Sequence, residues 1–335
     1  MHSQSQVWRS TPGGPARLVP QTQALPTLAP KEVLLRIRAA SLNYRDLLLA
    51  ADPRDGLVPL SDASAEIAAL GSDVRDWQVG DRVSPNFFPA WRNGRFSPAA
   101  LSQPLGGNER DGVLREHLVI EASALVAVPE HLSHAEAATL PCAALTAWHA
   151  LFERGQLQAG DTVLVQGTGG VALFGLQLAV AAGARVIVTS SSDEKLERAR
   201  ALGAWGLINY RRTPDWAAEA LRLTEGLGVD HILELGGPST YEQSVQAIGF
   251  GGRIAQIGVL SGFEAQPNLR PLQFNNASVN GICVGSVAQF QRMNAFISQH
   301  QIRPVIDQSF AFEDAAQAFE ALRAAQHVGK LVITL

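Results

Sequence analysis

The chain has 335 residues, 46% of them hydrophobic and 17% charged, and its 31 acidic and 27 basic side chains give a formal net charge of -4. This length predicts about two domains with sizeable cores. The mildly acidic balance, without a dense Lys/Arg stripe, argues against nucleic acid or an anionic membrane as the main partner. The only cysteines, Cys142 and Cys283, cannot build a disulfide framework or a four-thiolate zinc cluster, and so few thiols fit a reducing cytosol.

No membrane-spanning or secretory segment is expected. Residues 162–184 carry no charge, but they include two glutamines and several glycines, whereas a membrane span is more uniformly apolar. Two strands flanking a glycine turn and a helix explain this window better. The N-terminal residues lack the basic and then apolar pattern of a signal peptide. The sequence therefore predicts a soluble, cytoplasmic protein.

Residues 1–128 have the pattern of a β-rich domain with long loops. Residues 33–38 (VLLRIR) partly alternate between apolar and polar side chains, as a strand with one solvated face does. Proline and glycine punctuate residues 52–59 and 87–112, so both are expected to be loops. Long loops inside compact domains are often functional, and we expect the second loop, residues 87–112, to be the substrate-specific element. Plain solvated connections are the alternative for both.

The pattern changes at Ser133, which forms a capping-box sequence with Glu136 and predicts a helix over residues 134–154. Short apolar runs then alternate with helical stretches, which predicts βαβ units and a parallel sheet covered on both faces, an α/β fold. Expected strands occupy residues 162–165, 185–189, 231–235, 253–257 and 279–284, and expected helices occupy residues 171–182, 195–202 and 213–224. A last helix over residues 312–325 and a last strand over residues 330–333 are expected to follow.

A glycine turn follows the first of these strands and opens the first of these helices, as a dinucleotide-binding fingerprint requires. The turn consists of Gly167, Thr168, Gly169, Gly170, Val171 and Ala172. The first glycine permits the tight turn, the second lets the backbone approach a pyrophosphate, and the alanine lets helix and strand pack closely. The N-terminus of the helix offers N–H groups to the phosphates. The sequence therefore predicts a dinucleotide site, the alternative being a turn that only links strand and helix.

The end of the second strand indicates which dinucleotide binds. An NAD-preferring site usually has an Asp or Glu there, which holds the ribose hydroxyls. This chain has Ser190 and Ser191 instead, followed by Lys195, and hydroxyls with an ammonium suit the additional phosphate of NADPH. We therefore expect NADPH rather than NADH, with Ser191 and Glu194 as the capping box of the next helix. A merely solvated Lys195 is the alternative.

Several further segments occur in a characteristic order along the chain. They are residues 39–46 (AASLNYRD), 141–148 (PCAALTAW), 206–210 (GLINY), 257–259 (IGV) and 327–330 (HVGK). Together with the glycine turn, they resemble the medium-chain dehydrogenase/reductase superfamily, and in particular its zinc-independent quinone-oxidoreductase and enoyl-reductase branches. The resemblance extends over nearly the whole chain.

The resemblance implies a discontinuous GroES-like catalytic domain, residues 1–128 and 289–335, around a Rossmann nucleotide-binding domain, residues 129–288. It further implies a cofactor in the cleft between the domains and a homodimer formed through the last Rossmann strand. Cofactor contacts carried over by position are Thr146, Gly169, Gly170, Val171, Ser190, Lys195, Tyr210 and Lys330, with backbone groups near Gly258 and Val259 facing the nicotinamide. Asn43, Gly167, Thr168 and Ser191 complete the predicted set.

The resemblance also bears on zinc. Zinc-dependent members of the superfamily place a cysteine at the position of Asn43, a His-Glu pair at Asp62 and Ala63, and a second cysteine at Cys142. Catalytic zinc takes three protein ligands of nitrogen, sulfur or carboxylate type, and Asp62 with Cys142 makes an incomplete set. We therefore expect no catalytic zinc and no other metal.

Without a Lewis acid, the interconversion of carbonyl and alcohol loses the group that polarises the oxygen. Reduction of a C=C bond conjugated to a carbonyl, in a quinone, an enone or a 2-alkenal, is the easier assignment. Hydride from NADPH reaches the β-carbon, a donor stabilises the enolate oxygen, and a proton reaches the α-carbon.

The predicted catalytic residues are Asn43 as an amide donor, Tyr44 as an acid, Asp46 and Asp62. Arg45 and Asp46 are expected to orient the segment as an ion pair. Structural roles for Tyr44, Asp46 and Asp62 stay open as alternatives. Enoyl reductases of the superfamily often place a tyrosine shortly after this segment, and residues 47–60 contain none.

Two other functions remain open at this point. One is an alcohol dehydrogenase or ketone reductase of the same superfamily, acting without zinc or with an unusual ligand set. The other is a non-catalytic NADPH-binding sensor or partner protein, because intact cofactor motifs favour binding without requiring turnover.

Overall fold

The chain folds into two compact units in the computed structural model, which describes residues 4–11, 17–51, 54–107, 109–264 and 266–335. The first unit comprises Met1–Leu145 and Gly285–Leu335, and the second comprises Thr146–Val284. The predicted boundary after residue 128 lies earlier than this junction, because helix α3 (His134–Ala137) and the turn after it pack on strands of the first unit. None of the helices in the described part of the chain combines the length and apolar character that a membrane span requires.

The first unit is β-rich. Its strands are β1 (Gln4–Ser10), β2 (Leu18–Ala24), β3 (Glu32–Ser41), β4 (Asp62–Leu70), β5 (Arg82–Pro85), β6 (His117–Glu121), β7 (Leu125–Ala127), β14 (Ile306–Ala311) and β15 (Lys330–Thr334). Its other helices are α1 (Tyr44–Ala51), α2 (Pro98–Leu101), α10 (Val287–Gln299) and α11 (Ala315–Ala324).

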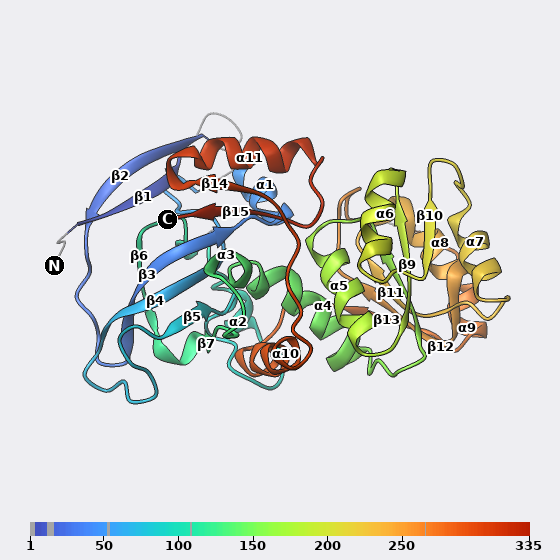
Figure 1. Ribbon diagram of the computed structural model, residues 1–335, viewed down its shortest axis with the longest axis horizontal. Coiled ribbons are helices and arrows are strands. Elements are labelled where there is room, and N and C mark those ends of the chain that lie inside the picture. Colours follow the sequence, from blue (N-terminus) through green and yellow to red (C-terminus); the bar gives the residue numbers. More distant parts are fainter. Residues whose placement is uncertain (1–3, 12–16, 52–53, 108, 265) are drawn as a thin grey trace. The chain divides into compact units, whose positions relative to one another are not determined.

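Strands β1 and β2 pair as a separate two-stranded sheet, whereas β3 to β7 share one sheet with the C-terminal strands β14 and β15. Its strand order is β14-β15-β3-β4-β5-β7, with β6 also paired to β3, and only β14 and β15 run parallel. Figure 1 shows the dark red β15 directly beside the blue β3. The alternation expected in β3 is confirmed, since Val33, Leu35 and Ile37 are buried in a core that also takes Phe319 from α11.

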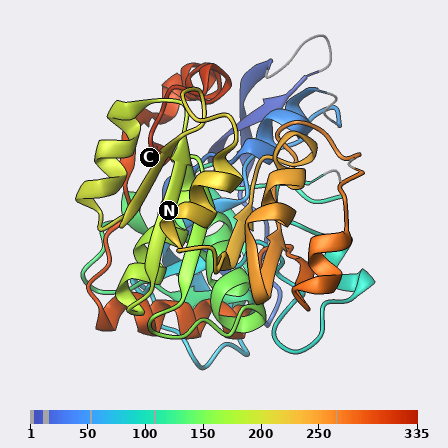
Figure 2. The same cartoon turned by 90° about the vertical axis from the view of Figure 1, so that its right-hand side faces the viewer.

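The second unit is a parallel α/β sheet. Its strands are β8 (Thr162–Gln166), β9 (Arg185–Ser190), β10 (Gly206–Asn209), β11 (Val229–Glu234), β12 (Ile248–Gln256) and β13 (Ser278–Gly281), and its helices are α5 (Gly170–Ala181), α6 (Asp193–Ala201), α7 (Trp216–Leu223), α8 (Pro238–Ala247) and α9 (Arg270–Phe274). The spatial order is β10-β9-β8-β11-β12-β13, and every neighbouring pair is parallel. Figure 2 shows these strands side by side. Counted from β8, this is the 3-2-1-4-5-6 order of dinucleotide-binding folds, with its switch point between β8 and β11.

Several sequence expectations need correction. The helix expected over residues 134–154 begins with the predicted Ser133–Glu136 capping box, but it consists of α3, π-helical turns at Leu140–Ala144 and His149–Arg154, and α4 (Leu145–Trp148) between them. Ser192, not Ser191, caps α6 by accepting the Lys195 N–H. Strand β13 ends at Gly281, before the expected residue 284. Strand β10 and helix α8 were not expected as elements, because both are short or weakly apolar.

Phe319 gives a test of the discontinuous unit. It is 1% exposed in the core that α11 shares with β3, so we expect Phe319→Ala to lower the free energy of unfolding by about 3–5 kcal/mol. Phe250→Ala is the matched control, because Phe250 is 76% exposed, and its effect should stay within about 0.5 kcal/mol. Urea denaturation measures both. Equal effects would show that α11 does not belong to this core.

Candidate active site

Polar residues from distant parts of the sequence meet at one end of the sheet of the first unit. Strand β3 pairs with β4 and β15, and the register places Ser41 opposite both Asp62 and Val332. Asn43 follows the end of β3, Asp62 is the first residue of β4, and Lys330 is the first residue of β15. The sheet thereby brings together Asn43, Asp62 and Lys330, although Asn43 and Lys330 lie near opposite ends of the sequence.

Lys330 is buried, and two oxygen atoms hold its ammonium. Nζ donates to Asn43 Oδ1 at 2.6 Å and to the backbone carbonyl of Leu42. Burial lowers the pKa of Lys330, and the negative charge of Asp62 opposes this effect. Because an ammonium can only donate, it fixes the Asn43 amide with Oδ1 toward Lys330 and Nδ2 away from it.

The Asn43 amide nitrogen is buried beside the Asp62 carboxylate. Nδ2 makes no hydrogen bond of ordinary geometry among the residues that the structure describes, but its N–H groups lie close enough to Asp62 to lower the pKa of that carboxyl as a hydrogen-bond donor does. A buried donor without a partner costs roughly 1–3 kcal/mol, so an acceptor oxygen brought by a ligand is favoured here. Asn43 therefore fits the predicted role of amide donor.

Asp62 is completely buried and accepts hydrogen bonds at both oxygens. The Ser61 hydroxyl donates to Oδ1 at 2.6 Å, and the Cys142 N–H, from the π-helical turn Leu140–Ala144, donates to Oδ2 at 3.0 Å. Burial raises the pKa of Asp62 against the opposing charge of Lys330. Burial also raises the pKa of the Cys142 thiol.

This donor set does not fit zinc. The described residues contain no group of three or more His, Cys, Asp or Glu side chains that could hold a metal ion. Both Asp62 oxygens are engaged, burial favours the protonated Cys142 thiol, and Lys330 already brings a positive charge to Asn43. A catalytic zinc takes three protein ligands, and a cysteine binds it only as the thiolate.

Asp46 lies on the first turn of α1, close to the same cluster. The Asn43 N–H donates to Oδ2 at 2.7 Å, whereas Oδ1 is buried without a partner in the described part of the chain. Arg45 and Asp46 are not within ion-pair distance in the described part of the chain, because adjacent helix positions point in different directions, although the charge of Arg45 still lowers the pKa of Asp46. Arg45 donates instead to the Leu105 carbonyl at 3.1 Å and lies over the Phe87 ring.

Tyr44 differs from the other predicted catalytic residues. Asn43, Asp46 and Asp62 lie in the cluster around Lys330, whereas the Tyr44 side chain is 41% exposed at the start of α1. Its role as an acid stays a prediction.

In the second unit, the glycine turn has the geometry of a phosphate site. Gly167 adopts a φ of +80°, and its N–H donates to the Thr189 carbonyl at 2.7 Å. A Cβ added at Gly169 would meet no atom within 4 Å, so the backbone there is open to a ligand at the N-terminus of α5. Thr168, Gly170 and Val171 continue this turn into the helix. The chain therefore fits a dinucleotide pyrophosphate at this place.

Small residues let α5 pack closely on the sheet. Ala172, at the third position of the fingerprint, is buried. Gly175 is a further position of this kind, which the sequence analysis did not select, because a Cβ there would lie 2.4 Å from Leu233 Cδ1.

The residues predicted to select the dinucleotide lie at the ends of β9 and β10. Ser190 ends β9, Lys195 lies in the first turn of α6, and the Tyr210 N–H donates to the Ser190 carbonyl at 3.0 Å. Ser191 lies between β9 and the cap of α6. The nearby carboxylate of Asp193 accepts from Arg212 and Asn209, so a second cation, which the sequence analysis missed, lies beside these residues.

Two polar residues that the sequence analysis did not select organise the loops beyond β8 and β11. Gln166 and Glu234 are the last residues of these strands, and Gln166 Nε2 donates to Glu234 Oε2 at 2.8 Å. The N–H groups of Ile257 and Gly258 donate to the Glu234 backbone carbonyl, and a Cβ at Gly258 would lie 1.9 Å from the Leu235 oxygen. The signal in the sequence was a polar residue directly after an apolar run, Val163–Val165 in β8 and Ile232–Leu233 in β11.

Thr146, Gly258 and Val259 complete the predicted cofactor set in the second unit. Thr146 is the first residue of the second unit and is buried. Val259 follows Gly258 in the loop after β12. The two remaining members, Asn43 and Lys330, belong to the first unit. All of these assignments stay predictions.

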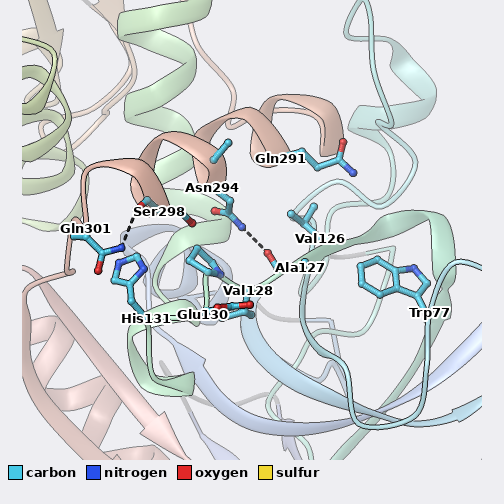
Figure 3. Close-up of a pocket in the computed structure, with 12 residues that line it drawn as sticks. Trp77, Val126, Ala127, Val128, Glu130, His131, Gln291, Asn294, Ser298 and Gln301 are labelled. Atoms are coloured by element: carbon cyan, nitrogen blue, oxygen red, sulfur yellow. Dashed lines mark hydrogen bonds between the residues drawn. The ribbon is translucent and has the colours of Figure 1, made fainter.

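A surface pocket of about 820 Å³ lies elsewhere on the first unit, between α10 and residues 126–131 (Figure 3). Trp77, Asn294 and His131 are among its twelve lining residues, and none of the twelve is a predicted site residue. Asn294 Nδ2 donates to the Ala127 carbonyl at 2.9 Å, so this side chain ties α10 to β7. The buried cluster around Lys330, and not this pocket, is the candidate for chemistry in the first unit.

Asp46 makes stability depend on pH. Burial raises its pKa from 3.8 to about 6, so the folded protein holds this proton more tightly than the unfolded chain does. The resulting stability is present below about pH 4 and is lost as the pH rises through about 6. Asp46→Asn cannot ionise, and we expect it to be more stable than wild type above pH 7, by up to about 3 kcal/mol.

Urea denaturation between pH 4 and pH 8 measures this effect, and the difference should vanish near pH 4. Asp76→Asn, at an exposed position between β4 and β5, is the matched control. A difference that does not change with pH would mean that Asp46 titrates alike in the folded and unfolded chain.

Two family models match the chain. An alcohol dehydrogenase GroES-like domain matches residues 29–130, and a zinc-binding dehydrogenase domain matches residues 170–299. The first model lies in the β-rich unit, and most of the second lies in the parallel α/β unit, from the start of α5 onward.

Full-length relatives agree with these models. A zinc-type alcohol dehydrogenase-like protein of Schizosaccharomyces pombe is 43% identical, with 95% of each chain covered, and a quinone oxidoreductase of Pseudomonas aeruginosa is 31% identical, with 96% of each covered. A solved structure from Sinorhizobium meliloti 1021, described as a candidate alcohol dehydrogenase, superposes with a TM-score of 0.94 at 42% identity over the whole of both chains. The chain therefore belongs to the medium-chain dehydrogenase/reductase superfamily and is an oxidoreductase.

Proposed function

We propose that this protein is an NADPH-dependent, zinc-independent reductase of a C=C bond conjugated to a carbonyl, in a quinone, an enone or a 2-alkenal. The observation that carries the proposal is the cluster in the first unit. Where zinc-dependent relatives would place metal ligands, Asn43 and Asp62 are bound to Lys330, Ser61 and the Cys142 backbone. The relation to a quinone oxidoreductase over 96% of both chains supports the same reaction class.

When bound, NADPH supplies the hydride. Asn43 Nδ2 is the donor for the carbonyl oxygen of the substrate, where negative charge develops as the β-carbon accepts hydride. Lys330 strengthens this donor, because a cation bonded to the amide oxygen polarises the amide and makes its N–H a better donor. Asp46 accepts a hydrogen bond from the backbone N–H of Asn43, and burial raises its pKa to about 6, so this carboxyl is suited to hold a proton for the α-carbon.

An alcohol dehydrogenase or ketone reductase is the second candidate function. It is favoured by the descriptions of the relatives, which include a zinc-type alcohol dehydrogenase-like protein and an NAD-dependent alcohol dehydrogenase structure with 32% identity, 99% of both chains covered and a TM-score of 0.89. The assay must therefore include ketones and alcohols as well as both dinucleotides.

We also propose that the protein forms a homodimer through β13. This strand is at the edge of the parallel sheet, and Val279 in its middle is 39% exposed. An edge strand offers unpaired backbone groups to a second copy.

NADPH consumption with a panel of acceptors tests the proposed reaction. We expect turnover with quinones, enones or 2-alkenals and little with saturated ketones, because a zinc-independent site has no Lewis acid to polarise a ketone oxygen. Asn43→Ala should lower kcat about 100-fold through loss of the oxyanion donor. Turnover of ketones and alcohols alone, or one tightly bound zinc per purified chain, would contradict the proposal.

Cofactor choice has its own test. If Lys195 contacts the additional phosphate of NADPH, Lys195→Ala should raise the Michaelis constant for NADPH about 10-fold and leave that for NADH unchanged. Lys31→Ala, at an exposed turn before β3, is the matched control for loss of a lysine. Equal use of NADH by wild type, or a silent Lys195→Ala, would refute the assignment.

A further inference from the structure

Glu234 is a carboxylate at the centre of the second unit that accepts five hydrogen bonds. Its side chain is fully buried. The donors are Gln166 Nε2, Ser244 Oγ, Thr240 Oγ1 and the backbone N–H groups of Gly236 and Gly237. Two carboxylate oxygens that face five donors act as acceptors only, which is the behaviour of the ionised group.

No cation neutralises this charge within ion-pair distance in the described part of the chain. Neutral dipoles stabilise the anion but leave its net charge, and the field of that charge extends further in a dry interior than in water. Tyr241 reports this field, because burial and then the charge of Glu234 raise the pKa of its hydroxyl.

The position of Glu234 connects it to the dinucleotide. It ends β11, and its partner Gln166 ends β8, so the pair lies at the switch point of the sheet, where ligands of such folds bind. The Glu234 backbone carbonyl also accepts the N–H groups of Ile257 and Gly258, at 3.0 Å and 2.9 Å. Gly258 and Val259 form the loop predicted to face the nicotinamide.

We propose that Glu234 sets the balance between oxidised and reduced cofactor: its buried negative charge favours the oxidised dinucleotide and thereby assists hydride donation. The inference rests on the proposed dinucleotide site. The reduced nicotinamide ring is neutral and becomes a cation when it gives up hydride. The Glu234 carboxylate, near the loop of Gly258 and Val259, therefore stabilises the oxidised ring selectively. With a separation on the order of 10 Å and an effective dielectric constant of about 20, the preference corresponds to about 10-fold in affinity.

The ratio of two dissociation constants isolates this effect. Titration calorimetry gives Kd for NADP⁺ and for NADPH, or for NAD⁺ and NADH if wild type binds that pair. Glu234→Gln should raise the ratio of the oxidised to the reduced Kd about 10-fold. A merely structural role of Glu234 would weaken both forms by the same factor and leave the ratio unchanged, which would overturn the inference.

Two further variants separate charge from packing. Ser244→Ala removes a donor to the same carboxylate but keeps the charge, so the ratio should stay at the wild-type value. Gln166→Met/Glu234→Gln removes the N–H that would face the new amide, and it serves as a second neutral variant if Glu234→Gln does not fold. This double variant should show the same raised ratio, and a wild-type ratio would overturn the inference.

Failure of the proposed function looks different. A wild-type protein that binds none of the four dinucleotides overturns the dinucleotide site and the inference with it. Binding that is tight for both forms, with a ratio that does not respond to loss of the Glu234 charge, overturns the inference alone.

Discussion

The antiparallel pairing of β15 with β3 is the constraint on which the first unit depends. It closes a sheet between the two ends of the chain, and it places Lys330 beside the residues that follow β3. A slip of one residue in this register would turn Lys330 to the other face of the sheet. The ammonium would then lose Asn43 Oδ1 and the Leu42 carbonyl, and the amide of Asn43 would lose its fixed orientation. The pairing of β15 with β3 thus determines which way the Asn43 amide points in the site.

The sequence predicted the parts of the fold that depend on local pattern. The apolar runs of β8, β9 and β11 are confirmed as parallel strands, and the Ser133–Glu136 capping box is confirmed by its reciprocal hydrogen bonds. Residues at strand ends were harder to interpret. Gln166 and Glu234 were not selected, because their partners Ser244 and Gly236 lie outside the two strands and only the fold brings these groups together.

The sequence predicted which residues belong to the candidate site, but not which of them contact one another. Asn43, Asp62 and Lys330 were each selected through motif positions, yet Lys330 was assigned to the cofactor, and nothing in the sequence indicated that its ammonium binds Asn43. The error over Arg45 and Asp46 has the same origin. Adjacent opposite charges suggest an ion pair, but the helix directs Arg45 toward Phe87 and the Leu105 carbonyl. Side-chain direction depends on backbone geometry, which spacing alone does not give.

Buried charges have partners of opposite charge in the first unit and only neutral hydrogen-bond donors in the second. This difference fits the ligand that each unit is proposed to bind. In the first unit, Lys330 lies near Asp62, and the charge of Arg45 acts on Asp46, so charges of opposite sign offset one another within the cluster. The group that this cluster offers to a ligand is the N–H donor on Asn43. Such a donor acts over hydrogen-bond distance and suits one oxygen of a small neutral substrate. In the second unit, hydrogen-bond donors alone surround Glu234, so its charge is not cancelled. An uncancelled charge acts over several ångströms and discriminates between ligands that differ in charge but hardly in shape, which is the difference between an oxidised and a reduced nicotinamide.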